Sequence, residues 1–144
     1  LRKTHFKGMN VEIIRKVAIQ LMTSLAFLKS LRIIHGDIKP ENIVLKEFNK
    51  TGIVKLFRIK LIDFGTSILA DDRHYDYLMS RYYRAPEVIM GAPYNEKIDM
   101  WSAGCVLAEL TMAGHSFLET AKNSRLFTFL RLLACQNLAL SRYS

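Results

Sequence analysis

Cysteine and proline are scarce in this sequence, with two and three residues among 144. Cys105 and Cys135 cannot form the disulfide framework of a small secreted domain or a cysteine-rich metal cluster, because both need more cysteines at regular spacing. Cys105 lies inside an apolar run, which predicts that it packs as a small buried hydrophobe. The scarcity of cysteine favours a reducing compartment, the cytosol or the nucleus.

Long hydrophobic runs are lacking as well. No stretch reaches the ~18–20 uninterrupted apolar residues that are needed to cross a bilayer. The most apolar stretch, residues 126–140, is interrupted by Arg131. The chain begins Leu1-Arg2-Lys3 with no apolar run behind it, so we expect neither a signal peptide nor a membrane partner. Because the first residue is not Met, we expect a fragment of a longer protein.

Acidic side chains are in the minority, with 13 Asp and Glu against 21 Lys and Arg and a net charge of +8. Such a balance can indicate a nucleic-acid partner. However, the basic residues are scattered, and no basic stretch is interleaved with aromatic residues as a stacking platform for bases requires. We interpret the charge as a solvated surface and expect no nucleic-acid partner.

The sequence does contain enough apolar residues, 50% of the chain, for one domain with its own core. Apolar residues recur at helical spacing over residues 11–28, and Asn10 is placed to cap that helix. Residues 99–110 (DMWSAGCVLAEL) are apolar on nearly every side, which predicts a helix buried at the centre of the core. A shorter amphipathic pattern at residues 126–133 predicts a further helix.

Two short β-type runs, residues 43–45 and 59–62, are separated by a polar segment that contains Asn49-Lys50-Thr51-Gly52, which predicts a β-hairpin. Residues 65–86 show no sustained periodicity, and a long irregular segment in a compact domain is usually a functional loop. The pattern as a whole predicts a mainly α fold with a small β-hairpin.

Four motifs that carry chemistry follow one another along the chain. They are residues 35–42 (HGDIKPEN), 63–65 (DFG), 84–87 (RAPE) and 99–104 (DMWSAG). In this order and spacing they make the sequence resemble the protein kinase family, whose chemistry is phosphoryl transfer. The resemblance implies the large, helical lobe of a kinase over residues 1–144, with residues 134–144 departing from the family pattern. It also implies that the small β-rich lobe, with its Gly-rich loop and ATP-binding lysine, is a missing partner.

The resemblance assigns catalytic and cofactor-binding roles, with ATP and Mg²⁺ as cofactors. Asp37 matches the aspartate that orients the substrate hydroxyl and accepts its proton, and Lys39 matches the lysine that steadies the transferred phosphate. Asn42 and Asp63 match the pair that holds Mg²⁺, as hard oxygen ligands for a hard cation. Val44 lies where the adenine pocket has its apolar floor, although a core strand residue is nearly as good an interpretation.

Supporting roles follow from the same resemblance. His35 is expected to support the loop and the Asp-Phe-Gly turn, and Asp99 to hold the loop backbone from the central helix. Ser80 falls where serine/threonine kinases place a hydroxyl against the catalytic aspartate and lysine. Glu87 is the glutamate of the Ala-Pro-Glu motif, whose arginine partner is expected beyond these residues.

The chain most resembles the dual-specificity tyrosine-regulated kinases, the DYRK family within the CMGC group, over residues 1 to about 133. The resemblance rests on residues 33–37 (IIHGD), 75–77 (YDY), 80–87 (SRYYRAPE) and 99–102 (DMWS). Most kinases have Arg, and this family Cys, where the chain has Gly36, so an activation phosphate cannot be clamped there in the usual way.

Regulation by phosphate is also implied by this resemblance. Tyr77 matches the tyrosine that the family phosphorylates on itself, and Arg81 and Arg84 are the guanidinium groups expected to hold that phosphate. The alternative is that Tyr75 and Tyr77 are ordinary exposed loop residues.

The function expected from the sequence is an ATP-dependent Ser/Thr protein kinase of dual-specificity type, acting on protein substrates and seen as an incomplete chain. Glu41 lies where basic substrate residues can be met, and the family favours Pro after the phosphorylated residue. A catalytically inactive kinase-like interaction module and a nonfunctional fragment remain as alternatives.

Overall fold

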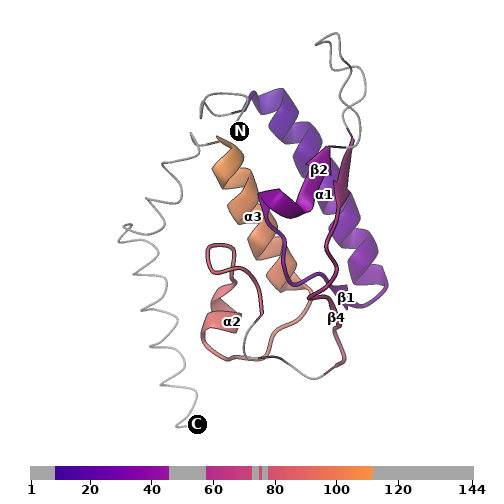
Figure 1. Ribbon diagram of the computed structural model, residues 1–144, viewed down its shortest axis with the longest axis vertical. Coiled ribbons are helices and arrows are strands. Elements are labelled where there is room, and N and C mark those ends of the chain that lie inside the picture. The colour runs from indigo at the N-terminus through magenta and orange to yellow at the C-terminus, as the bar shows by residue number, and fades with distance from the viewer. Residues whose placement is uncertain (1–8, 46–57, 73–74, 76–77, 112–144) are drawn as a thin grey trace.

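The structure is a computed structural model of the chain and describes residues 9–45, 58–72, 75 and 78–111. Along the chain it contains α1 (Val11–Ser30), β1 (Ile33–Ile34), a 3₁₀ turn (Pro40–Asn42), β2 (Ile43–Leu45), β3 (Ile59–Leu61), β4 (Ile68–Leu69), α2 (Pro86–Ile89) and α3 (Lys97–Thr111). Helices α1 and α3 lie side by side, and the short strands and connecting loops lie against them (Figure 1). None of the described helices is long and apolar enough to cross a membrane.

Helix α1 begins where the sequence predicts. The side chain of Asn10 accepts a hydrogen bond from the backbone N–H of Glu12 at 2.8 Å, which satisfies one of the free donors of the first turn. The buried residues are Val17, Leu21, Leu25 and Leu28, spaced three or four apart on one face. The predicted helix and its cap are confirmed, and the helix continues two residues beyond Leu28.

Helix α3 is the central helix predicted from residues 99–110. Its buried residues include apolar side chains such as Ile98 and Val106, but also the polar Asp99, Ser102 and Glu109. Buried polar groups need hydrogen-bond partners, so each of them points to a contact with another segment. The apolar character on nearly every side of α3 therefore reflects its burial against several loops as well as against α1.

Two antiparallel strand pairs complete the described fold. Strand β2 pairs with β3, with Ile43 opposite Leu61, which confirms the pairing predicted for the hairpin. Strand β3 ends at Leu61, and the N–H of Ile62 donates to the backbone oxygen of Asn42 at 3.0 Å, which continues the register of the pair by one residue. The polar connection of the predicted hairpin and the helix predicted at residues 126–133 lie outside the described residues.

The segment predicted to be irregular contains an unpredicted strand, β4, and is followed directly by α2. Strand β4 pairs with β1, so that Ile33 lies opposite Leu69. Two residues are too few to leave a periodic signal, which explains why the sequence pattern did not show this pair. The β1–β4 pair brings the loop after β1 next to the segment that follows β3.

Ion pairs and a hydrogen bond stabilise the segment after β4. The guanidinium of Arg32 forms an ion pair with Asp71, and its Nη1 lies 3.1 Å from Oε1 of Glu96, just before α3. The hydroxyl of Tyr94 accepts a hydrogen bond from the backbone N–H of Tyr75 at 2.8 Å. This segment is therefore attached to the region before α3 directly at Tyr75 and indirectly, through Arg32, at Asp71.

Candidate active site

The carboxylate of Asp37 is the centre of a hydrogen-bonded cluster in the loop after β1. Its Oδ1 accepts a hydrogen bond from the hydroxyl of Ser80 at 2.6 Å. Its Oδ2 accepts hydrogen bonds from Nζ of Lys39 at 2.6 Å and from Nδ2 of Asn42 at 3.1 Å. The side chain of Asp37 is only 12% exposed, so the cluster keeps a carboxylate at the edge of the protein interior.

Asp37 and Lys39 each stabilise the charged form of the other. Burial alone would raise the pKa of Asp37, but the hydrogen bonds from Lys39 and Ser80, with the Lys39 charge, outweigh it and lower the pKa. The hydrogen bond to Asp37 in turn raises the pKa of Lys39. Near neutral pH the cluster thus holds a carboxylate, an ammonium group and a hydroxyl within hydrogen-bonding distance, since Lys39 Nζ also donates to Ser80 at 3.2 Å.

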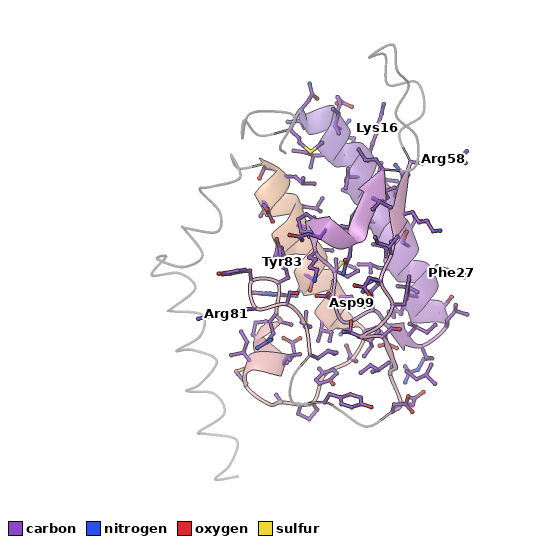
Figure 2. The ribbon with its side chains drawn as sticks, in the orientation of Figure 1. Lys16, Phe27, Arg58, Arg81, Tyr83 and Asp99 are labelled. Carbon is purple, nitrogen blue, oxygen red and sulfur yellow. The ribbon has the colours of Figure 1, made fainter. Side chains whose placement is uncertain are left out.

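Asp99 of α3 holds the backbone of this loop from below. Its Oδ2 accepts the N–H of His35 at 2.7 Å, and its Oδ1 accepts the N–H of Gly36 at 3.0 Å. Asp99 is 2% exposed, and burial raises the pKa of its carboxyl while the two backbone donors offset part of that effect. The loop is thereby fixed to the central helix immediately before Asp37; Figure 2 shows Asp99 between α3 and the loops.

His35 connects the loop to the segment that contains Asp63. The histidine is fully buried, its Nε2 lies 3.1 Å from the backbone oxygen of Ile62, and its ring stands 4.6 Å from the ring of Phe64. The hydroxyl of Thr66 donates to the backbone oxygen of His35 at 3.3 Å. Because the His35 side chain is fully buried, it cannot contact a substrate. Its contacts instead join the loop after β1 to the segment that contains Asp63.

Asp63 and Asn42 provide oxygen atoms that suit a hard divalent cation such as Mg²⁺. Asp63 is exposed and has a left-handed backbone (φ 63°), and its charge acts on Lys39, whose pKa it helps to raise after the main contribution from Asp37. Asn42 is 5% exposed and contacts Asp37 through its amide nitrogen. Among the described residues, no group of three or more His, Cys, Asp or Glu could hold a metal. Two protein oxygens fit Mg²⁺, which keeps several waters and uses substrate phosphates as ligands.

The segment that delivers Ser80 is held by Arg84. The guanidinium donates from Nε to the backbone oxygen of Leu78 at 2.9 Å and from Nη2 to that of Met79 at 2.8 Å. The family resemblance led us to expect Arg84 as a ligand of a phosphate. Its hydrogen bonds to these two backbone oxygens were not predicted. Arg81 is exposed and projects outward (Figure 2). Tyr77 lies outside the described residues.

Two other predicted residues lie further from this cluster. Val44 is half-buried on β2, where it pairs with Lys60. Glu87 lies in the first turn of α2 and is half-buried. Neither side chain takes part in the described hydrogen bonds of the Asp37 cluster.

A buried pair next to the cluster was missed in the sequence. The hydroxyl of Tyr83 donates to Oε2 of Glu109 at 2.6 Å, and the two residues are only 6% and 7% exposed. Burial, followed by the hydrogen bond and charge of Glu109, raises the pKa of Tyr83 far above its ordinary value. The hydroxyl of Ser102 donates to the backbone oxygen of Tyr83 at 2.8 Å. An acidic residue within a helix predicted to be buried was the signal that could have revealed this pair.

Comparison with known proteins gives one consistent family. The protein kinase domain matches residues 2–139 of the chain. A "Probable serine/threonine-protein kinase dyrk2" of Dictyostelium discoideum is 47% identical over 110 residues, which are 76% of this chain and 11% of that protein. The "Dual specificity tyrosine-phosphorylation-regulated kinase mbk-2" of Caenorhabditis elegans is 42% identical over 134 residues, 92% of this chain and 16% of that protein.

A third relative has the same type of name. The "Putative dual specificity tyrosine-phosphorylation-regulated kinase 3 homolog" of Drosophila melanogaster is 47% identical over 116 residues, 81% of this chain and 13% of that protein. The chain therefore spans between 11% and 16% of the length of these relatives.

Proposed function

This chain belongs to the protein kinase family, as a DYRK-like kinase domain, and we propose that it transfers the γ-phosphoryl group of ATP to serine and threonine hydroxyls of proteins. The names of its relatives add dual specificity, which includes tyrosine. We assign residues 1–144 to the large lobe of the kinase, with the small lobe as the partner that completes the ATP site.

The observation that carries this proposal is the hydroxyl of Ser80 bound to Asp37 beside Lys39. A carboxylate offers about four acceptor positions on its two oxygens, so Asp37 can accept another hydroxyl while it keeps these partners. Lys39 places a positive charge next to that position. The cluster therefore has the groups that orient a hydroxyl and neutralise a phosphate that approaches it.

The proposed reaction balances on these atoms. The substrate hydroxyl oxygen forms a bond to the γ-phosphorus, and the bond from that phosphorus to the bridging oxygen of ATP breaks. The electron pair of the broken bond leaves with ADP, and the hydroxyl proton passes to Asp37. Its lowered pKa keeps Asp37 ionised, so it is ready to accept the proton as the new bond forms.

The proposal also assigns ligands to the cation and the nucleotide. Asn42 and Asp63 would hold Mg²⁺, which supplies charge neutralisation for the phosphates when it is bound. Val44 would contact the adenine, with the strand-core interpretation as the alternative. The residues themselves suit these roles because they are oxygen donors and an apolar strand residue.

The remaining assignments concern support, regulation and substrates. Asp99 and His35 position the loop, and Glu87 supports the Ala-Pro-Glu turn. Tyr77 is the proposed site of self-phosphorylation, with Arg81 and Arg84 as its phosphate ligands. We expect protein substrates that have Pro after the acceptor residue and basic residues that can contact Glu41. We expect the protein to act in the cytosol or the nucleus.

Transfer of labelled γ-phosphate from ATP to a Ser/Thr peptide by the full-length protein tests the proposal. Asp37→Asn should abolish transfer, because it removes the proton acceptor but keeps the shape of the side chain. Asp72→Asn is the matched control, since Asp72 is exposed and lies outside the cluster. No transfer by the unchanged protein, or equal transfer by Asp37→Asn, would overturn the proposal and leave the inactive interaction module.

A further inference from the structure

Gly36 lies between His35 and Asp37 with a left-handed backbone (φ 75°) and without room for a side chain. A Cβ atom at this position would lie 2.9 Å from Cδ1 of Leu78 and 2.9 Å from the backbone oxygen of Thr66. Such distances are shorter than carbon atoms normally tolerate. The space beside the loop backbone is thus filled by Leu78 itself.

Leu78 has little freedom to yield. It is 6% exposed and belongs to a buried cluster whose other members are Ile34, Met79, Ala85, Val88, Tyr94 and Ile98. Its backbone oxygen accepts the hydrogen bond from Nε of Arg84. Both side chain and backbone of Leu78 are therefore fixed, and a group added at Gly36 would have to displace a packed residue.

Displacement of Leu78 would reach the proposed catalytic carboxylate through the chain. Ser80 follows Leu78 by two residues, and its hydroxyl must stay within hydrogen-bonding distance of Asp37 and Lys39. We infer that Gly36 is a positioning residue: by leaving room for Leu78, it docks residues 78–84 on the loop and sets Ser80 against Asp37. The catalytic consequence rests on the proposed function, whereas the docking does not.

The described contacts that dock residues 78–84 are all made by groups of the chain itself. In the described part of the chain, residues 78–84 are attached to their surroundings by packing on Gly36, by the Ser80 hydroxyl and by the contacts of Tyr83 with α3. Within the segment, Arg84 binds the backbone oxygens of Leu78 and Met79. A larger residue in place of Gly36 would meet Leu78 and the backbone oxygen of Thr66. Packing at Gly36 therefore does the positioning that a charged side chain at this place could not do here.

The test compares two glycines in the full-length protein. Gly91 also has a left-handed backbone (φ 66°), but a Cβ atom there would have nothing within 4 Å. Gly36→Ala and Gly91→Ala thus share the backbone strain, and only the first displaces Leu78. We expect Gly36→Ala to lower kcat by on the order of 10- to 100-fold, the cost of slightly misplaced groups. Gly91→Ala should stay within about twofold of the unchanged protein.

A second substitution tests the contact with Leu78 directly. Leu78→Val removes Cδ1, the side-chain atom closest to the added Cβ, so it should restore part of the kcat lost in Gly36→Ala. Full recovery is not expected, because Thr66 still lies 2.9 Å from the Cβ position. Added to Gly91→Ala, the same change should cause only its own small loss. Equal effects on both backgrounds would show no coupling between residues 36 and 78 and would overturn the inference.

Hydrogen exchange separates this inference from the proposed function. The N–H of Tyr83 donates to the backbone oxygen of Ser80 at 2.9 Å, so its exchange rate reports on residues 78–84 whether or not the protein transfers phosphate. We expect this N–H to exchange at least tenfold faster in Gly36→Ala and at an unchanged rate in Gly91→Ala. Equal exchange in the two variants would overturn the docking role, even in an active kinase. Faster exchange in Gly36→Ala without any phosphate transfer would support the docking and reject only the kinase reaction.

Discussion

The hydroxyl of Ser80 donates a 2.6 Å hydrogen bond to Oδ1 of Asp37, although 43 residues separate the two in the sequence. This contact joins the loop after β1 to the segment before α2. It also shows that Asp37 accepts a hydrogen bond from a hydroxyl, as the proposed substrate hydroxyl would require. The contact therefore combines two functions, one in positioning a loop and one in setting the charge of a carboxylate.

Ser80→Ala should change the pH dependence of phosphate transfer. The hydrogen bond from Ser80 helps to lower the pKa of Asp37, so its loss raises that pKa, and the ionised carboxylate is then lost at a higher pH as the solution is acidified. The acidic limb of the kcat profile should move to higher pH, and kcat should fall by roughly 10- to 100-fold, since a hydrogen bond to a charged group contributes about 1.5–3 kcal/mol.

A suitable control for this change is Ser30→Ala, because the Ser30 hydroxyl donates only to the nearby backbone oxygen of Phe27 on the surface. Its profile should match that of the unchanged protein. An acidic limb that stays in place in Ser80→Ala would contradict the role given to the Ser80 hydroxyl.

Asp99→Ala should damage stability as well as activity. It leaves the buried N–H groups of His35 and Gly36 without an acceptor, and each unsatisfied donor costs about 1–3 kcal/mol. The free energy of unfolding should therefore fall by about 2–6 kcal/mol. Denaturant unfolding of the full-length protein measures this, with the exposed Asp72→Ala as control. A stable but inactive Asp99→Ala protein would show that the carboxylate acts on the reaction and not on the loop.

Asp63→Asn should remove Mg²⁺-dependent transfer and leave the fold intact. The side chain is exposed, and Asn tolerates the left-handed backbone of this position, so stability has little reason to change. The loss follows because an amide is a weaker ligand for a hard cation than a carboxylate. Transfer rates over a series of Mg²⁺ concentrations, with the melting temperature measured in parallel, test it. Normal activity at low Mg²⁺ would mean that Asp63 is not a ligand.

Asn42→Ala offers a comparison within the same site. Its amide nitrogen donates to Asp37 at two atoms, so this change should weaken both Mg²⁺ dependence and the Asp37 cluster. A loss of about 1 kcal/mol or more in the free energy of unfolding should accompany the loss of activity, because a part-buried hydrogen-bonded group is removed. Activity lost without any change in stability would assign Asn42 to the metal alone.

Tyr77 should carry phosphate in the active full-length protein. Phosphate adds about −1.5 to −2 charge, which Arg81 can meet from its exposed position. Arg84 already donates to two carbonyls, so we expect Arg81→Ala to weaken the effect of phosphorylation more selectively than Arg84→Ala. Mass spectrometry of protein made in bacteria, together with Tyr77→Phe, tests this. An active enzyme without phosphate on Tyr77, and a Phe variant of equal activity, would refute it.

Local patterns predicted the long elements of the fold well. Helices α1 and α3 have enough residues for a periodic signal, and the Asn10 cap is encoded within two residues of its partner. The β1–β4 pair and α2 could not be predicted in this way, because two- and four-residue elements form only when distant segments meet. Short elements depend on tertiary contacts that the local sequence does not contain.

Most members of the candidate site belong to motifs, and the family resemblance led us to expect even the distant Ser80 and Asp99 beside the Asp37 loop. Asp37, Lys39 and Asn42 share one octapeptide, so their grouping was evident from the sequence. The packing of Leu78 on Gly36 was not evident from the sequence, because a glycine does not indicate which distant residue packs against it. The same holds for the carbonyl partners of Arg84, which depend on the path of the backbone and not on residue type.

One helix fixes the spacing between the loops of the site. On α3, Asp99 binds the loop before Asp37, while Ser102 and Glu109 both bind Tyr83, from the segment that follows Ser80. An inserted or deleted residue between Asp99 and Ser102 would rotate one contact by about 100° relative to the other. We therefore expect natural relatives to vary in length within their surface loops and to keep an unbroken count of residues along this helix. Evolution can change the side chains of α3 one at a time, but it cannot shift their register.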